Sequence, residues 1–153
     1  MNDKLKVRKS VEGDTDAVYR LLCVIADVHK KGRPDMFSDL VSKYTAEEVR
    51  ARLSKDENGV FVAEINGSVV GYIFCEIIKE GKGLTLYIDD LCVEPEARRC
   101  GIATALMDHA CAYGKEKGCQ CLMLNVWEFN RSALDFYKKY GFTTRTRHLE
   151  MQL

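Results

Sequence analysis

The stretch from Asp89 to Thr104 reads DDLCVEPEARRCGIAT, and it determines how the rest of the chain is arranged. The segment Leu84–Val93 is expected to form a strand. Its residues Thr85–Ile88 are apolar or β-forming on both faces, which predicts a central strand with both faces covered. Apolar residues at helical spacing after Gly101 predict a helix over Ile102–Lys117. A strand that passes through a short turn into a helix is a building unit of α/β sheets, whose ligands usually bind at the carboxyl end of the strand.

The turn between this strand and this helix is suited to an anion. A helix start offers unpaired N–H groups and the positive end of the helix dipole. Gly101 has no Cβ and Ala103 is small, so a phosphate can approach the main chain, while Arg98 and Arg99 add permanent positive charge. These residues predict a phosphorylated ligand, specifically a pyrophosphate. The alternative is that the arginines are solvated and that Gly101 only allows a tight helix start.

Two common phosphate-binding loops are excluded. The chain contains no GxxxxGK[ST] run, which the P-loop requires. The dinucleotide fingerprint GxGxxG is also absent from this turn, which has Gly101 as its single glycine.

The first half of the chain predicts a strand, two helices and a long connection. A strand is expected around Leu5–Lys9, and apolar residues at helical spacing from Val18 to Val28 predict the first helix. The stretch His29–Tyr44 loses this period, and long connections of this kind often carry function. A capping box at Thr45–Glu48 opens a second helix, which we expect to end at Leu53.

The second half predicts a mixed sheet. Val60–Ile65 and Val69–Ile78 flank Asn66-Gly67, a pair typical of a type I′ hairpin turn. After the strand and helix described above, the sequence predicts a strand at Cys121–Val126, a helix capped by Asn130 and ended by Gly141, and a last strand over Phe142–Leu153. The element order is then β-α-α-β-β-β-α-β-α-β. The expected fold is α/β of the mixed α+β kind, with a mostly antiparallel sheet of six to seven strands and helices on both faces.

Length and composition describe a compact domain. The 153 residues contain no repeat or linker, so we expect a single domain over 1–153. The 23 basic and 23 acidic residues balance, which argues against nucleic acid as a partner. No run approaches the length of a membrane helix, and we expect a cytoplasmic protein with no membrane partner. Seven cysteines without a CxxC pair are expected to be reduced and structural, with no metal bound.

Two motifs together resemble a known family. The run RRCGIA at 98–103 resembles the R/Q-x-x-G-x-G/A signature of the GNAT superfamily of acyl-CoA-dependent N-acetyltransferases, with Ala103 as a permitted variant of the last glycine. The run NRSALDFYKKYGF at 130–142 is similar to its second motif, N-x-x-A-x-x-F/L-Y-x-x-x-G-F. The stretch YIDDLCV at 87–93 is also similar to the spermidine/spermine acetyltransferases. The resemblance covers nearly the whole chain and implies the fold of that family.

The resemblance implies which residues bind acetyl-CoA. Main-chain groups of Leu91, Cys92 and Val93 would pair with the pantetheine arm like an added strand. The pyrophosphate would lie on the turn, and Asn130 would touch the arm of the cofactor. The implied residues of the turn are Arg98, Arg99, Cys100, Gly101, Ala103 and Thr104.

The resemblance also implies an acid and a base. Tyr137 matches the tyrosine that protonates the thioester sulfur, although its spacing alone favours core packing. An amine with a pKa of about 10.4 is almost wholly charged at pH 7, so a positioned base should help the reaction. Asp89 matches the proposed base of the polyamine enzymes, with Glu76 or a water relay in reserve. Adjacent strand residues point to opposite faces, so a regular strand would present only one of Asp89 and Asp90 to a cleft.

The expected function is transfer of an acetyl group from acetyl-CoA to a primary amine by direct attack in a ternary complex. We expect a small acceptor such as a polyamine, and a protein or peptide amine is the alternative. A non-catalytic acyl-CoA-binding module, a nucleotide-binding regulator and an acyl-enzyme route through Cys92 or Cys100 are weaker hypotheses. A homodimer is possible. His29, Trp127 and Phe129 are open candidates for the acceptor cleft.

Overall fold

The computed structural model describes residues 4–57 and 59–153. The helices are α1 (Thr15–Gly32), α2 (Pro34–Phe37), α3 (Ala46–Leu53), α4 (Ile102–Glu116) and α5 (Arg131–Tyr140), with short 3₁₀ turns at Glu12–Asp14 and Pro95–Ala97. The strands are β1 (Lys6–Lys9), β2 (Val60–Ile65), β3 (Ser68–Glu80), β4 (Gly83–Val93) and β5 (Cys119–Leu124). None of the helices in residues 4–57 and 59–153 combines the length and the apolar character that a membrane span requires.

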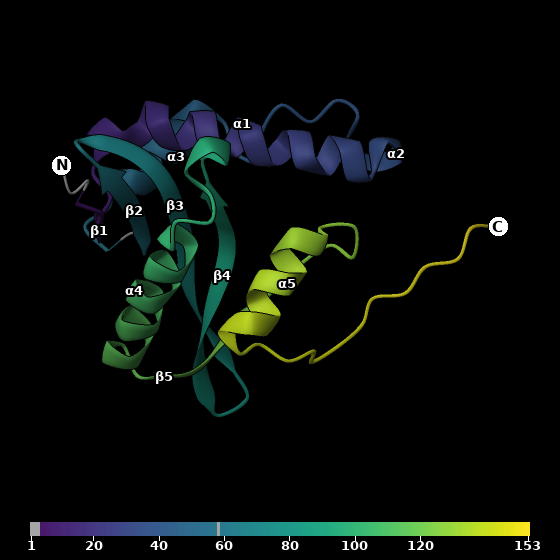
Figure 1. Ribbon diagram of the computed structural model, residues 1–153. Coiled ribbons are helices and arrows are strands. Elements are labelled where there is room, and N and C mark those ends of the chain that lie inside the picture. Colours follow the sequence, from purple (N-terminus) through teal and green to yellow (C-terminus); the bar gives the residue numbers. More distant parts are fainter. Residues whose placement is uncertain (1–3, 58) are drawn as a thin grey trace.

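The five strands form one mixed sheet in the order β1-β2-β3-β4-β5 (Figure 1). The first three pairings are antiparallel, and β4 pairs with β5 in parallel. The parallel pairing follows from the chain path, because α4 carries the chain back along the sheet between these two strands. The predicted hairpin is confirmed: Asn66 and Gly67 both have positive φ, at 50° and 80°, as a type I′ turn requires.

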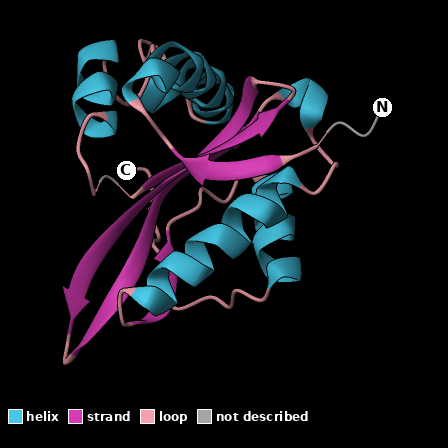
Figure 2. Cartoon of the chain, turned by 90° about the vertical axis from the view of Figure 1, so that its left-hand side faces the viewer, coloured by secondary structure: helices cyan, strands magenta, loops and turns pink. Residues whose placement is uncertain are grey.

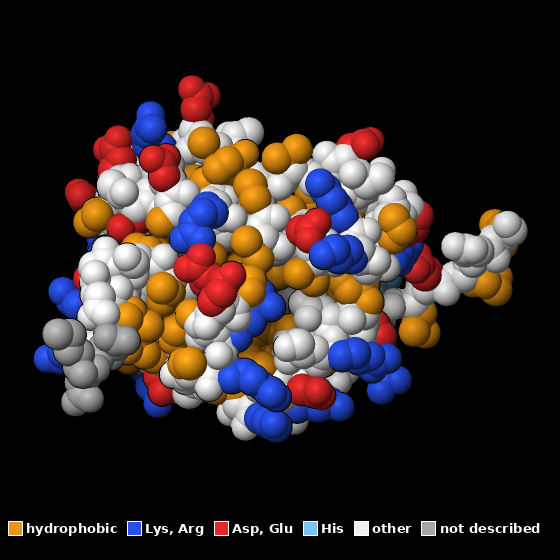
Figure 3. Space-filling view, turned by 45° about the horizontal axis from the view of Figure 1, so that its top comes forward, with side chains coloured by type: hydrophobic (Ala, Val, Ile, Leu, Met, Phe, Trp, Pro, Cys, Tyr) orange, Lys and Arg blue, Asp and Glu red, His pale blue; other side chains and the backbone are white. Residues whose placement is uncertain are grey.

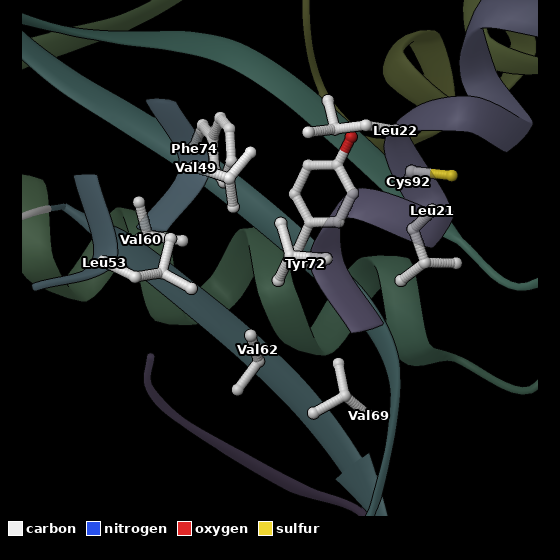
Figure 4. Close-up of a cluster of buried hydrophobic side chains, with 11 residues drawn as sticks. Leu21, Leu22, Val49, Leu53, Val60, Val62, Val69, Tyr72, Phe74 and Cys92 are labelled. Atoms are coloured by element: carbon white, nitrogen blue, oxygen red, sulfur yellow. The ribbon is translucent and has the colours of Figure 1, made fainter. Parts of the chain in front are cut away.

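Helices pack on both faces of the sheet (Figure 2). Alternate residues of each strand point to opposite faces, so the sheet divides the core into two clusters. In one cluster, Leu21 and Leu22 of α1 pack against Tyr72 and Phe74 of β3 (Figure 4). In the other, Leu106 of α4 packs among the side chains of the opposite face. The sheet is therefore fixed from both sides, and its strand ends are held in a defined position.

Three expectations need correction. The segment Phe142–Leu153 does not form a strand, so five strands are present where six to seven were expected, and the predicted element order is not confirmed. Its residues have strand-forming character, but a strand also needs a neighbour for its main-chain groups, and the segment extends away from the body of the protein (Figure 1). The stretch His29–Tyr44 also contains more helix than expected.

The additional helix has a local cause. Helix α1 continues to Gly32 because His29, Lys30 and Lys31 are compatible with a helix and favourable at its negative C-terminal end. Pro34 then occupies the first turn of α2, where its missing N–H costs nothing. The irregular part of this connection is consequently short.

Candidate active site

The sheet opens where β4 extends beyond β5. Their parallel pairing runs from Leu84 opposite Cys119 to Ile88 opposite Leu124, whereas β4 continues to Val93. Among the described residues, no strand pairs with the β5-facing edge of β4 along residues 89–93. Main-chain groups on such an edge can pair with an extended ligand. The predicted binding segment 91–93 lies along it.

A cavity of about 200 Å³ lies at this opening. It is bounded by the end of α1, by the end of β4, by the last residue of β5 with the three that follow it (124–127), and by α5. The cavity brings together the predicted Asp89, Leu91, Asn130 and Tyr137. It also includes the open candidates His29, Trp127 and Asp90, and it adds Lys43. The turn at 98–101 lies outside this lining, on the chain that follows β4.

A β-bulge places two carboxylates at the cavity. Phe74 pairs with Asp90 and Cys75 pairs with Ile88, so Asp89 is an extra residue of β4 with no partner on β3. The bulge interrupts the alternation of side chains along the strand. Asp89 and Asp90 consequently both line the cavity. The expectation that only one of them would reach a cleft was based on a regular strand, and it is wrong here.

Asp89 is held by three side chains. The Lys43 ammonium lies 2.8 Å from Oδ1, and Oδ2 accepts hydrogen bonds from the Tyr44 hydroxyl at 2.5 Å and from Arg52 at 3.4 Å. Burial alone would raise the pKa of Asp89, but the hydrogen bonds from Lys43 and Tyr44 outweigh it and hold the pKa below its ordinary value. Asp89 therefore remains ionised, which suits it to bind a cation and makes it a weak base.

Asp90 has the opposite character. Its Oδ2 accepts a 2.7 Å hydrogen bond from the buried Tyr72 hydroxyl, and its Oδ1 accepts one from the Leu91 N–H at 3.0 Å. Burial raises the pKa of Asp90, and the hydrogen bond from Tyr72 opposes this shift without cancelling it. Two neighbouring carboxyl groups with different pKa values can take different roles, one binding a cation and the other accepting a proton.

Glu76 belongs to the same network but does not line the cavity. Its carboxylate pairs with Arg52, which also contacts Asp89. The side chain of Glu76 is 46% exposed. Glu76, the reserve base, is therefore connected to Asp89 through Arg52 and lies outside the lining of the cavity.

Tyr137 differs from its neighbour Tyr140 on α5. The Tyr140 hydroxyl donates a 2.7 Å hydrogen bond to Asp108 and lies 3.3 Å from the Cys111 sulfur. Tyr137 lines the cavity, and among the described side chains none forms a hydrogen bond with its hydroxyl. Burial, together with the charge of Asp90, raises the pKa of Tyr137 to about 12. Tyr137 is therefore a protonated phenol at neutral pH with its hydroxyl available to a ligand.

The turn before α4 has the geometry of an open helix start. Arg99 and Gly101 have positive φ values of 63° and 77°, and no side chain caps the helix at Gly101. The N–H groups of the first helical turn, which includes Ala103 and Thr104, consequently lack intrahelical acceptors. The Arg98 guanidinium donates to the Val93 carbonyl at 3.1 Å and so ties the turn to the end of β4.

The two cysteines near the site are not equivalent. Cys92 is buried, and burial raises the pKa of its thiol to about 12, so it is not a thiolate at neutral pH. Cys100 is exposed in the turn, with its sulfur 3.5 Å from the Arg98 carbonyl. Asn130 caps α5 by accepting the Ala133 N–H at 3.3 Å and lines the cavity from there.

An aromatic cluster forms part of the wall of the cavity and the layer behind it. The Phe37 ring of α2 lies 5.5 Å from both His29 and Trp127, and Trp127 stacks on Phe129 at 5.7 Å. His29 and Trp127 line the cavity, and the two phenylalanines support them. Burial, with a smaller contribution from Lys43, lowers the pKa of His29, so the imidazole is neutral at pH 7.

Sequence reasoning missed Lys43, Tyr44 and Arg52. Lys43 and Tyr44 lie in the irregular segment before α3, and Arg52 lies on α3. No local pattern marks them, because their role depends on a contact with a strand more than 35 residues away. The capping box that begins at Thr45 fixes the position of α3 and hence of this group.

Comparisons with known proteins find related sequences. The sequence profile of the acetyltransferase (GNAT) family matches residues 25–142. A thialysine N-epsilon-acetyltransferase of Bos taurus is 31% identical over 150 residues, covering 88% of this chain and 82% of that protein. An uncharacterised N-acetyltransferase of Methanocaldococcus jannaschii is 38% identical over 93 residues, which cover 59% of this chain and 41% of that protein.

The fold is shared with solved structures. A tetramutant of the BH1408 protein from Bacillus halodurans superposes with a TM-score of 0.83, at 23% identity, over 97% of this chain and 99% of that one. At this identity the likeness concerns the fold. It shows that the overall fold of this chain recurs in another protein.

Proposed function

The chain belongs to the acetyltransferase (GNAT) family, and from this premise we propose that it transfers an acetyl group from acetyl-CoA to a primary amine by direct attack in a ternary complex. The observation that carries the proposal is the cavity at the end of β4, which holds a free phenol and two carboxylates. It lies beside the open edge of β4, and the chain continues from that strand into the turn before the uncapped helix α4.

The residues of this opening fit coenzyme A. The edge of β4 at Leu91–Val93 can bind the amides of the pantetheine arm, and Asn130 lies across the cavity from it. The pyrophosphate would be held by main-chain N–H groups from Cys100 to Thr104, with charge from Arg98 and Arg99. When bound, the cofactor supplies an acetyl thioester.

Tyr137 is the proposed general acid. Its raised pKa keeps the phenol protonated, and its hydroxyl has no competing side-chain partner among the described residues. As the amine nitrogen bonds to the acetyl carbon, the carbon–sulfur bond breaks and negative charge develops on sulfur. Tyr137 donates its hydrogen bond, and then its proton, to that sulfur.

The two carboxylates handle the amine. Deprotonating an alkyl ammonium at pH 7 costs roughly 4–5 kcal/mol, from a pKa of about 10.4. We assign Asp89 to receive the ammonium in place of Lys43, since both groups are primary ammoniums. Asp89 can also accept the proton through a water, but its lowered pKa makes Asp90 the better proton acceptor.

The proposed acceptor is a small molecule with an aliphatic primary amine, such as a polyamine. The carboxylates in the cavity support a cationic acceptor, and the related Bos taurus enzyme is named for acetylating the ε-amine of thialysine. A lysine side chain of a peptide presents the same group, so a peptide amine is the alternative acceptor.

An acceptor panel tests the proposal. Purified protein is incubated with acetyl-CoA and polyamines, lysine analogues, aminoglycosides or lysine peptides, and released thiol is measured. We expect turnover with at least one aliphatic amine and intersecting initial-rate patterns. Parallel patterns would indicate an acyl-enzyme, and coenzyme A binding without turnover of any amine would indicate a non-catalytic module.

A further inference from the structure

Four aromatic rings beside the cavity form a closed circuit of contacts. Phe37 lies 5.5 Å from His29 and from Trp127, measured between ring centres. Phe129 stacks on Trp127 at 5.7 Å and meets His29 edge-on at 6.1 Å. These four residues are the aromatic cluster, and they come from α1, from α2 and from the segment between β5 and α5. Each ring packs against two others, so the rings hold one another in place.

Gly32 fixes the position of the aromatic cluster on α1. A Cβ at this residue would lie 2.3 Å from Cδ2 and Cε2 of Phe129 and 2.5 Å from its Cγ. The φ of Gly32 is not positive, so the backbone does not require a glycine here. The missing side chain instead leaves the space that the Phe129 ring occupies. Any larger residue would have to displace the whole ring.

The aromatic cluster gives the cavity a fixed apolar wall. His29 and Trp127 line the same cavity as Asp89, the proposed site of the acceptor ammonium. An acceptor bound there shares about 200 Å³ with this wall and with the acetyl end of the cofactor. A single benzene ring fills a cavity of roughly 150 Å³. Little width is therefore left next to the nitrogen of the acceptor.

The side chain of Lys43 shows which shape reaches Asp89. Its ammonium stands at the end of an unbranched four-carbon stem and lies 2.8 Å from Oδ1 of Asp89. Burial lowers the pKa of His29, and the charge of Lys43 lowers it further, so this ammonium is also within electrostatic reach of the aromatic cluster. An unbranched alkylammonium of the chain itself thus fits beside Asp89 and the wall.

Charge outside the cavity does little to select among amines. The chain has 23 basic and 23 acidic residues. On the face drawn in Figure 3, which includes α1, Lys and Arg side chains are interspersed with Asp and Glu side chains. Such a surface lacks the one-signed field that steers a charged ligand over a distance. Amines of equal charge are then distinguished by their shape inside the cavity.

We propose that the aromatic cluster determines acceptor specificity: it admits a primary amine at the end of an unbranched carbon chain and excludes an amine whose nitrogen-bearing carbon is branched or part of a ring. The methylene groups of the chain would lie against Trp127 and His29, whereas a branch would overlap with rings that cannot move aside. Gly32 is a positioning residue that acts through Phe129. This inference rests on the proposed function, because it places the acceptor ammonium at Asp89.

Two isomeric amines test the proposal in acetyl transfer. Pentan-1-amine is unbranched, and pentan-2-amine is branched at the carbon that bears the nitrogen, so the two differ in shape and not in charge or composition. We expect the kcat/KM ratio of the unbranched to the branched isomer to fall at least tenfold in Trp127→Ala. Trp127→Phe keeps a ring at this position and should keep the ratio. An unchanged ratio in Trp127→Ala would overturn the proposal, even if the overall rate fell.

A binding measurement tests the same inference without turnover. Trp127 is the only tryptophan of the chain, so tryptophan fluorescence reports directly on the aromatic cluster. With coenzyme A present, pentan-1-amine should change the emission saturably, and pentan-2-amine should need at least a tenfold higher concentration. An emission that responds equally to both amines, or to neither, would contradict the proposal.

Gly32→Ala tests how the aromatic cluster is positioned. The added Cβ should displace the Phe129 ring from Trp127, change the emission of the free protein and weaken the binding of pentan-1-amine at least fivefold. Gly13→Ala is the matched control, because a Cβ there meets no atom within 4 Å and the φ of Gly13 is not positive. Equal binding by the two variants would show that Gly32 does not position the aromatic cluster.

Failure of this inference is distinguishable from failure of the proposed function. Shape-selective binding without acetyl transfer to any amine would reject the proposed function and leave the selection of ligands by the aromatic cluster intact. Acetyl transfer with the same isomer ratio in the wild-type protein and in Trp127→Ala would reject the inference and leave the proposed function intact.

Discussion

The ammonium of Lys43 lies 2.8 Å from the Oδ1 atom of Asp89 and 3.0 Å from the main-chain oxygen of the same residue. The side chain of Asp89 is 11% exposed and that of Lys43 is 43% exposed, and both residues line the cavity. A primary ammonium of the chain thus occupies the position in which the proposed mechanism needs the ammonium of the acceptor. Lys43 acts as an internal competitor.

Lys43→Ala should lower the KM for a small amine about three- to tenfold, because the acceptor no longer displaces a charged partner worth roughly 1 kcal/mol. The affinity for coenzyme A should not change. Steady-state kinetics with the best acceptor of the panel measures the effect. Lys31→Ala is the control, since it removes an exposed lysine that pairs with Asp27 on α1. A raised KM in Lys43→Ala would show that Lys43 helps to bind the acceptor.

Tyr137→Phe should reduce kcat by a factor of 10² to 10⁴, the usual range for losing a general acid. It should leave the affinity for coenzyme A nearly unchanged, because the ring remains. The measurement combines steady-state kinetics with titration of coenzyme A.

Tyr140→Phe is the matched control on the same helix. It removes a hydroxyl that donates to Asp108, so it should lower stability by about 1 kcal/mol and leave kcat intact. Equal kcat values for the two variants would remove Tyr137 from the proposed mechanism.

Local sequence signals predicted most of the fold. Asn66-Gly67 marked the hairpin, Thr45 and Glu48 marked the start of α3, and Gly101 marked the start of α4. Each of these signals acts within a few residues. The prediction of a final strand over residues 142–153 is wrong for the opposite reason. These residues have a strand pattern, but whether they form a strand depends on a neighbouring strand that the pattern does not specify.

The candidate site was predicted in part. The family resemblance implied that Tyr137, Asn130 and Asp89 belong to one site, and the structure brings all three to one cavity. Their catalytic and binding roles stay predictions. The bulge at Asp89 could not be predicted, because it arises from the register between β3 and β4. The lowered pKa of Asp89 likewise depends on a hydrogen bond from Lys43, a residue 46 positions away in the sequence.

Gly101→Ala should weaken coenzyme A binding. The φ of Gly101 is 77°, and a Cβ there meets no atom within 4 Å, so the strain lies in the backbone conformation. An alanine in this region costs roughly 1–2 kcal/mol and should shift the turn toward a conformation that aims its N–H groups differently. We expect at least a tenfold increase in the Kd for coenzyme A, measured by calorimetry.

Gly81→Ala is the matched control for Gly101→Ala. Gly81 also has a positive φ, at 56°, with no atom within 4 Å of a Cβ, and it lies in the β3–β4 turn. The two variants should lose similar stability in thermal unfolding, while Gly81→Ala should bind coenzyme A normally. Equal affinities in both variants would show that the turn at Gly101 does not hold the cofactor.

The pH dependence of kcat/KM should report Asp90. Burial raises the pKa of this carboxyl above its ordinary value, and the group must be ionised to accept a proton. Activity should therefore be lost as the pH falls through this raised pKa. The lowered pKa of Asp89 keeps that carboxylate charged over the same pH range. Asp89 should therefore not produce this loss of activity at low pH, which is the acid limb of the profile.

Tyr72→Phe tests the assignment, because the Tyr72 hydroxyl donates a 2.7 Å hydrogen bond to Asp90 and thereby stabilises its charged form. Removing that hydroxyl should raise the pKa of Asp90 further and move the acid limb of kcat/KM to higher pH. Tyr44→Phe removes the corresponding hydrogen bond from Asp89, and it should raise the KM for the amine without moving the limb. If Tyr44→Phe moves the limb and Tyr72→Phe does not, then Asp89 accepts the proton and Asp90 serves to support the strand end.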